Sequence, residues 1–353
     1  MAKIDLSKFS FTGKQVQEIS ELVWEILRET GNAFKFVTTY PNIKVDTEVG
    51  FVGEGGLVGV KSTGCNPQPQ DFQIGTRIIK WTPEDWEVLL DMCYKELEDT
   101  IASLGLNSGV RKPDLTDTDY MQVIVEALRK AMERFVWRFL WFNDKAATNV
   151  TDGGLVKDGI DPKYFNIIDG LWKQIYAQVV VNPSQHVTIT ENSGATYALQ
   201  ALDDDKVRKM LFDMTFLAPL ELRDLPGTAI YVTQSVYDAY YRSLTDAEKV
   251  AIESREENFI NGMPALKCNG YQVIAMPEWD RIIRMYFDNG TTLHLPHRAL
   301  MTNVKVLGAG FDSMEDFSNL NVWYEKKERK VYVEAMGNGD AKLMHPGLFV
   351  AAY

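Results

Sequence analysis

Apolar side chains recur at helical spacing in three early segments. From Thr12 to Gly31 they follow a Thr–Gln capping pair, which predicts an amphipathic N-terminal helix. A second helix is predicted from Thr82 to about Leu104, because Thr-Pro-Glu-Asp supplies an N-cap, a proline in the first turn and two acids. A third stripe over residues 119–142 predicts a helix of about 36 Å. These three patterns predict helices at residues 12–31, 82–104 and 119–142.

The amino-acid composition changes between Asn42 and Trp81. Seven glycines are interleaved there with Val, Phe, Ile and Leu, and residues 66–70 read NPQPQ. Such a segment is unsuited to a helix and has little apolar core of its own. It predicts a long two-stranded excursion that must pack against something else.

Downstream of Phe165, predicted helices alternate with strands. The triplet Asp203 to Asp205 opens an amphipathic helix that carries an apolar stripe ending at Leu217, and Thr245 with Glu248 forms a capping box. The remaining predictions are a strand at Ala229 to Thr233 leading into a helix at Ser235, hairpins at Asn269-Gly270 and at Asp288-Asn289-Gly290 between IIRMYF and TTLHL, and strands at Val322 to Tyr324, Val331 to Ala335 and Leu348 to Ala351. The pattern predicts an α+β protein.

Length and charge narrow the class of protein. A single core stops growing at about 250 to 300 residues, so a chain of 353 residues should divide its core or extend part of itself outside it. With 37 basic and 49 acidic residues, its net charge of -12 argues against a protein that grips nucleic acid. Three widely spaced cysteines exclude a disulfide framework and favour a reducing compartment. The N-terminal residues lack the apolar core of a signal peptide, and the most apolar stretch, residues 135–142, is too short to span a bilayer. We expect a soluble intracellular chain, or one exported without a Sec signal.

Candidate chemistry is sparse. A phosphate loop would need glycine where Val60 precedes Lys61, so the glycine-rich segment favours a flexible strand pair. His294 and His297 flank Pro296 without a metal-binding pattern, and we expect solvent-exposed histidines at strand ends. Cys93 lies on the apolar stripe of the second predicted helix, which indicates a buried inert thiol. We expect no enzyme, no cofactor and no metal, with a site assembled from residues far apart in the sequence as the open alternative.

Several strings, taken in order, resemble the major capsid proteins of tailed bacteriophages, whose shell-forming fold is shared with herpesvirus capsid floors and encapsulins. They cover about residues 80–310 and carry no catalytic signature. The strings are Trp81-Thr-Pro-Glu-Asp-Trp86 with Leu97, Trp141-Phe-Asn-Asp144, Phe165-Asn166, Asp169-Gly-Leu-Trp-Lys-Gln174, Tyr231-Val-Thr-Gln-Ser-Val236 with Tyr240, Asn269-Gly270 before Pro277-Glu-Trp-Asp280, Pro296-His-Arg-Ala-Leu300 and Leu307-Gly308.

The resemblance implies a tailed-phage major capsid fold with a set order of parts. Residues 1–42 would form an N-terminal arm and residues 43–82 an extended β-hairpin loop. Residues 83–164 and 296–353 would form a peripheral domain with a spine helix at about 119–142, and residues 165–295 an axial α/β domain.

The resemblance also implies a function and partners. The chain would be a structural subunit that self-assembles into hexamers and pentamers of an icosahedral virion capsid in the host cytoplasm, enclosing double-stranded DNA that it contacts non-specifically. A separate scaffolding protein, a portal and decoration proteins would be further partners, with no membrane involved. An encapsulin-like compartment subunit is the alternative. The implied subunit-interface residues lie in the hairpin, where Lys61 is also a candidate for a covalent cross-link: Val49, Phe51, Val52, Leu57, Val58, Val60 and Lys61.

The acidic excess is not spread evenly over the implied parts. Residues 83–117 carry three basic and nine acidic groups, and residues 166–295 carry eleven and seventeen, so each segment contributes a charge of -6. The other segments are neutral. Neutral parts let identical copies meet without summed repulsion, and acidic surfaces facing the packaged DNA would leave the duplex free to slide.

Overall fold

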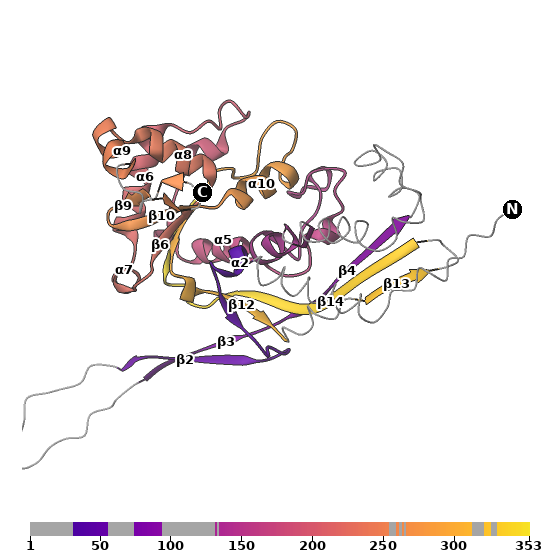
Figure 1. The fold of residues 1–353 in the computed structure, drawn as a ribbon. Helices are drawn as coiled ribbons and strands as arrows, with labels where there is room; N and C mark the ends of the chain where they lie inside the picture. The colour runs from indigo at the N-terminus through magenta and orange to yellow at the C-terminus, as the bar shows by residue number, and fades with distance from the viewer. Residues whose placement is uncertain are drawn as a thin grey trace, which may run out of the picture.

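The computed structural model describes residues 31–55, 74–93, 131–132, 134–253, 259–260, 263–264, 266–312, 321–325 and 330–353. Two β-sheets organise these residues, and a separate hairpin projects from the body (Figure 1). The α+β prediction is confirmed. The predicted N-terminal helix lies outside the described residues, as do residues 119–130 of the predicted spine helix.

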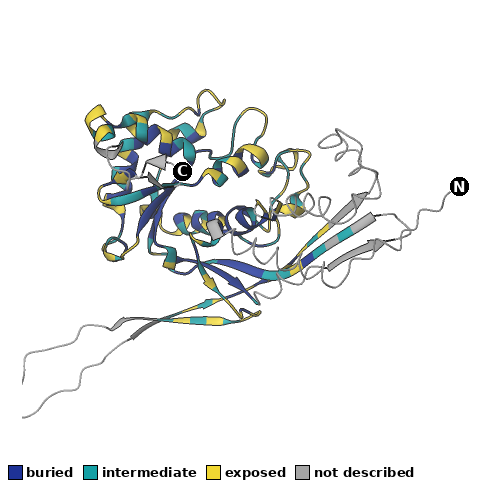
Figure 2. Ribbon diagram, in the orientation of Figure 1, coloured by how far each residue is buried: buried dark blue, intermediate teal, exposed yellow. Residues whose placement is uncertain are grey.

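A six-stranded sheet forms one half of the body. Its strands, in spatial order, are β5 (His186–Val187), β15 (Phe349–Ala352), β11 (Ala299–Thr302), β6 (Ala229–Val232), β10 (Tyr271–Ala275) and β9 (Leu266–Cys268). The three central strands are buried along their whole length (Figure 2). Alternate residues serve different cores: Tyr231 joins the core under α5, whereas Ile230 joins the core under α6 and α8. Burial on both faces explains the unbroken apolar runs of these strands.

Helices cover both faces of this sheet. They are α5 (Leu171–Val181), α6 (Asp204–Leu217), α7 (Leu220–Asp224), α8 (Gln234–Ser243), α9 (Asp246–Glu253) and α10 (Pro277–Tyr286). The predicted caps are confirmed: the Asp203 side chain accepts from the Asp205 amide, and Thr245 exchanges hydrogen bonds with Glu248 at the start of α9. The Asn269-Gly270 hairpin is also confirmed, with φ of 48° and 88° at its two turn residues.

The second sheet has five strands and forms the other half of the body. They are β1 (Thr38–Tyr40), β12 (Leu307–Phe311), β14 (Lys330–Leu343), β13 (Asn321–Glu325) and β4 (Glu84–Cys93). The helix over residues 134–142 packs here through Phe135 and Phe139, and this part of the predicted spine helix is confirmed. α5 is tied to the same sheet, because the Gln174 side chain donates to the Ala341 carbonyl and accepts from the Leu343 amide.

The helix predicted from Thr82 is wrong, since β4 occupies its first half. Trp86 is buried and Val88 half-buried while Glu87 and Leu89 are exposed, which is the alternation of a strand. β4 pairs with β14 over ten residues, and the expected cap residue Thr82 instead donates its amide to Asp340 at 2.9 Å. Tertiary pairing therefore overrides the local capping pattern. The side chain of Cys93 is outside the described part.

The second predicted hairpin is wrong on one side. Asp288-Asn289-Gly290 forms a turn, with Gly290 at φ 87° and a bridge from Asp288 to Leu293. The segment before it is α10, whose buried residues Trp279, Ile282 and Ile283 follow helical spacing behind an N-terminal proline. The predicted C-terminal strands are confirmed as β13, part of β14 and β15.

Candidate functional site

The β2–β3 hairpin is the main feature that extends from the body. β2 (Glu48–Gly55) and β3 (Ile74–Lys80) pair antiparallel, with an irregularity between Val52 and Gly55. In Figure 1 the hairpin reaches away from both sheets. Its two strands pair only with each other among the described residues, so each presents a free edge of backbone donors and acceptors.

Trp81 fixes the root of the hairpin. Its side chain is fully buried and contacts Ile43 and Met344. Glycines in β12 make room for the indole, because a Cβ on Gly310 would lie 2.8 Å from the ring and one on Gly308 3.2 Å from it. The Trp81 amide donates to the Thr47 carbonyl at 2.9 Å, which joins the two ends of the hairpin. The direction of the hairpin is therefore set by a packed side chain.

The inner face of the hairpin rests on its own chain. Val49, Phe51 and Ile79 pack against the Trp81 cluster, and the Phe51 and His345 rings lie 4.6 Å apart. Arg77 donates to the Met344 carbonyl at 2.5 Å. The opposite face includes Ile78, which is 62% exposed. The hairpin thus has a face already covered and a face open to another molecule.

The predicted interface residues fall into two groups. Val49 and Phe51 contact the body of their own chain. The side chains of Val52, Leu57, Val58, Val60 and Lys61 lie outside the described part of the structure, so their contact with a neighbouring subunit stays a prediction.

An ion pair and a neutral histidine lie near the root of the hairpin. Lys80 pairs with Asp46 at 2.9 Å, and this hydrogen bond raises the pKa of Lys80. Burial lowers the pKa of His345, and the neighbouring Arg77 lowers it further. His345 is therefore neutral at neutral pH, which suits its edge contact with an aromatic ring.

The turn between α6 and α7 carries a second exposed apolar surface. Phe216 is 65% exposed, Leu217 46% and Leu220 71%. Sequence reasoning placed Leu217 on the buried stripe of α6, which is wrong because the buried residues of that helix end at Thr215. The run FLAPL at residues 216–220 is the signal that could have found this surface.

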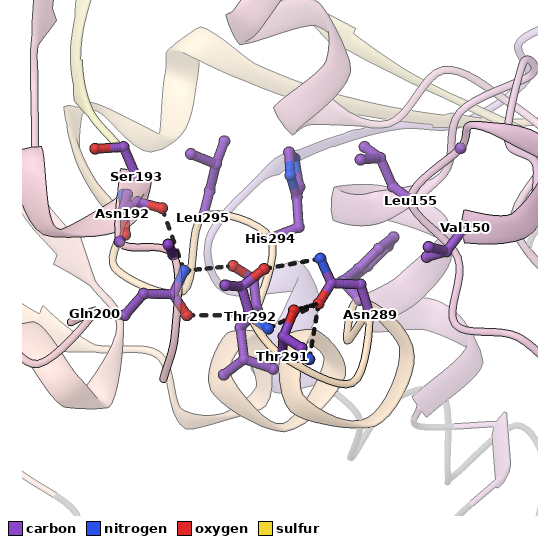
Figure 3. A pocket seen from close by; sticks show the side chains of 15 residues that line it. Val150, Leu155, Asn192, Ser193, Gln200, Asn289, Thr291, Thr292, His294 and Leu295 are labelled. Atoms are coloured by element: carbon purple, nitrogen blue, oxygen red, sulfur yellow. Dashed lines mark hydrogen bonds between the residues drawn. The ribbon is translucent and has the colours of Figure 1, made fainter. Parts of the chain in front are cut away.

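The expectation of exposed histidines at 294 and 297 is wrong for both residues, because His297 is buried and His294 is half-buried. His297 is hydrogen-bonded to the Asn192 side chain and to the Gln200 backbone carbonyl. The side-chain amides of Asn192 and Gln200 belong to the wall of a cavity of about 490 Å³ (Figure 3). Gln200 bonds the Leu293 backbone through both ends of its amide, and Asn289 bonds residues of its own turn. The side-chain amides of Asn192, Gln200 and Asn289 therefore use their hydrogen bonds to stabilise the loop over residues 287–297.

Among the described residues, no group of three or more His, Cys, Asp or Glu residues could hold a metal ion. None of the helices formed by those residues has the length and apolar character needed to cross a bilayer.

Comparison with known proteins gives a fold. No family model matches the chain, and no curated protein is significantly similar to it. A chain from the procapsid of satellite phage P4 that includes the size determination (Sid) protein matches 94% of this chain and 98% of its own, at 11% identity and a TM-score of 0.52. A chain from Gordonia phage Cozz matches 91% and 85%, at 11% identity and a TM-score of 0.50.

Both matches cover more than nine tenths of this chain. Such a likeness at low identity reports shared architecture. The chain has the shell-forming fold of tailed-phage capsid proteins.

Proposed function

We propose that the chain is a structural subunit of an icosahedral viral capsid, which self-assembles into hexamers and pentamers around double-stranded DNA. The observation that carries this proposal is the match to a phage procapsid chain over 98% of that chain's length. The same match covers 94% of this chain.

The hairpin supports assembly on physical grounds. An isolated two-stranded hairpin is only marginally stable in water, so one with two free edges needs a surface to lie on. Its root and inner face use their own chain, which leaves the outer face with Ile78 for a neighbour. We assign the remaining interface residues to the same contact: Val52, Leu57, Val58, Val60 and Lys61.

We also propose the division into an arm (1–42), a hairpin loop (43–82), a peripheral domain (83–164 and 296–353) and an axial domain (165–295). The described strands add one qualification. β11 and β15 come from the last segment but pair in the six-stranded sheet with β6 and β5. The proposed domains would therefore share a continuous sheet and move together.

Charge supports the proposed relation to DNA. A net charge of -12 disfavours tight phosphate binding, so DNA would be held by enclosure and contacted without sequence preference. A scaffolding protein, a portal and decoration proteins are proposed partners, and the virion is the proposed location.

Negative-stain microscopy of the full chain, purified alone and after co-expression with a scaffolding protein from its own genome, tests the proposal. Closed shells with five-fold vertices are expected. A monodisperse 40 kDa monomer under every assembly condition would contradict it. Shells that carry a protein cargo and never DNA would instead indicate a cellular compartment.

A further inference from the structure

Ser235 lies on a strand–turn–helix junction beside a small cavity. β6 ends at Val232, and Ser235 is the second residue of α8. The cavity has a volume of about 190 Å³, and Ser235 lines it together with His297, Asp280 and Arg284. Ser235 is partly exposed, so a small molecule in this cavity can reach its hydroxyl.

The hydrogen bonds fix the direction of the serine proton. His297 Nε2 lies 2.6 Å from the Gln200 carbonyl oxygen, which can only accept, so Nε2 carries the ring proton. Burial lowers the pKa of His297 and keeps the ring neutral at pH 7. Nδ1 is then an acceptor, and the Ser235 hydroxyl, 2.7 Å away, donates to it. This is the arrangement of a nucleophile with its general base.

The base is held by groups beyond the pair. The Asn192 side chain donates to the His297 carbonyl at 2.8 Å and accepts from the His297 amide at 3.0 Å. Gln200, whose carbonyl orients the ring, is itself fixed by the Leu293 backbone. The imidazole therefore needs little reorganisation before it can take a proton.

This arrangement lacks the free backbone amides that bind the oxyanion in a hydrolase. The Gln234 amide at the α8 N-terminus donates to the Asp280 carboxylate at 2.5 Å, and the Ser235 amide lies 3.4 Å from the same group. In a hydrolase, such amides would stabilise the oxyanion that forms during the reaction. Here they are occupied by the Asp280 carboxylate, whose negative charge would repel an oxyanion. The geometry favours a single modification over turnover.

We propose that Ser235 is a nucleophilic modification site, activated by His297, that accepts a small acyl group from an activated ester. The Ser235 Oγ–C bond forms as the C–O bond of the ester breaks. The leaving alkoxide or phenolate takes the bonding electron pair, and the serine proton passes to Nδ1 of His297. An acetyl group, with three heavy atoms, is small enough for a cavity of about 190 Å³.

Acetylation of the full chain with p-nitrophenyl acetate, followed by peptide mapping, tests the proposal. The control residue is Ser184, an exposed serine whose hydroxyl donates to the Asn182 side chain and not to a histidine. Because general-base catalysis contributes about 100-fold or more, Ser235 should be acetylated at least about 100-fold faster than Ser184. His297→Gln should bring the Ser235 rate down to that of Ser184, whereas Ser184→Ala should leave it unchanged.

If His297→Gln fails to fold, the pH dependence of the acetylation rate of Ser235 in the native sequence tests the proposal. Groups near the ring are Glu191, Asp280, Arg284 and the Gln200 carbonyl. The Ser235 rate should be level above pH 6.5 and fall only in more acidic buffer, whereas the Ser184 rate should keep rising with pH. Equal rates at the two serines, or parallel pH profiles, would overturn the proposal.

Discussion

Gly310→Ala tests whether the packing of Trp81 fixes the hairpin root. The new methyl group would lie 2.8 and 2.9 Å from the indole ring, closer than real Cβ atoms come, and 3.1 Å from Ile43, which is a tight contact. Overpacking of this kind costs about 1 to 3 kcal/mol. The loss of backbone freedom in the unfolded chain returns about 0.5 kcal/mol. We therefore expect a net destabilisation of about 0.5 to 2.5 kcal/mol.

The assay is denaturant unfolding of the unassembled chain, with Gly347→Ala as the matched control. A Cβ on Gly347 meets nothing within 4 Å, so that variant should be neutral or slightly stabilised. Trp81→Phe removes the ring atoms that clash, so adding Gly310→Ala to it should cost at least about 1 kcal/mol less than in the native background. Equal costs in both backgrounds would refute the idea that the glycine exists to admit the indole.

Three further predictions follow from single contacts. Ile78→Asp should leave the unfolding free energy within about 0.5 kcal/mol of the native value, because the side chain is 62% exposed, yet it should reduce the shell yield measured by light scattering. The control Val250→Asp, at a 65% exposed position on α9, should leave the shell yield unchanged. Equal yields for the two variants would count against the hairpin contact. Thr245→Ala removes the cap of α9 and should cost about 1 kcal/mol in unfolding, a result contradicted by unaltered stability. Burial raises the pKa of Asp280 to about 6, so the stability from this carboxyl is present below about pH 4 and is lost as pH rises to about 6. Asp280→Asn should flatten the pH profile of the unfolding free energy in that window by about 3 kcal/mol, and an unchanged profile would be contrary evidence.

Local signals in the sequence predicted local structure well. The caps at Asp203 and Thr245 and the turn at Asn269-Gly270 depend on residues within four positions of one another, so the sequence contains all the partners. The β2–β3 excursion was predicted for a similar reason, since its glycines and alternating apolar residues exclude a helix over the whole segment.

Features that depend on distant partners could not be predicted. Thr82 carries a good helix cap, but Asp340 and ten residues of β14 draw the segment into a sheet. His297 is buried and hydrogen-bonded to Asn192 and Gln200, which lie about a hundred positions earlier. The Ser235–His297 pair joins residues 62 positions apart, and no spacing rule links them. The inner face of the hairpin was identified as apolar, but only the fold shows that Val49 and Phe51 contact their own chain.

The most direct test of the central claim is the assembled state of the full chain, imaged with its scaffolding protein by electron microscopy. We predict closed icosahedral shells in which the β2–β3 hairpin of each subunit lies on a neighbour with Ile78 covered. A chain that stays a 40 kDa monomer in every condition, or shells in which the hairpin contacts no other subunit, would contradict it.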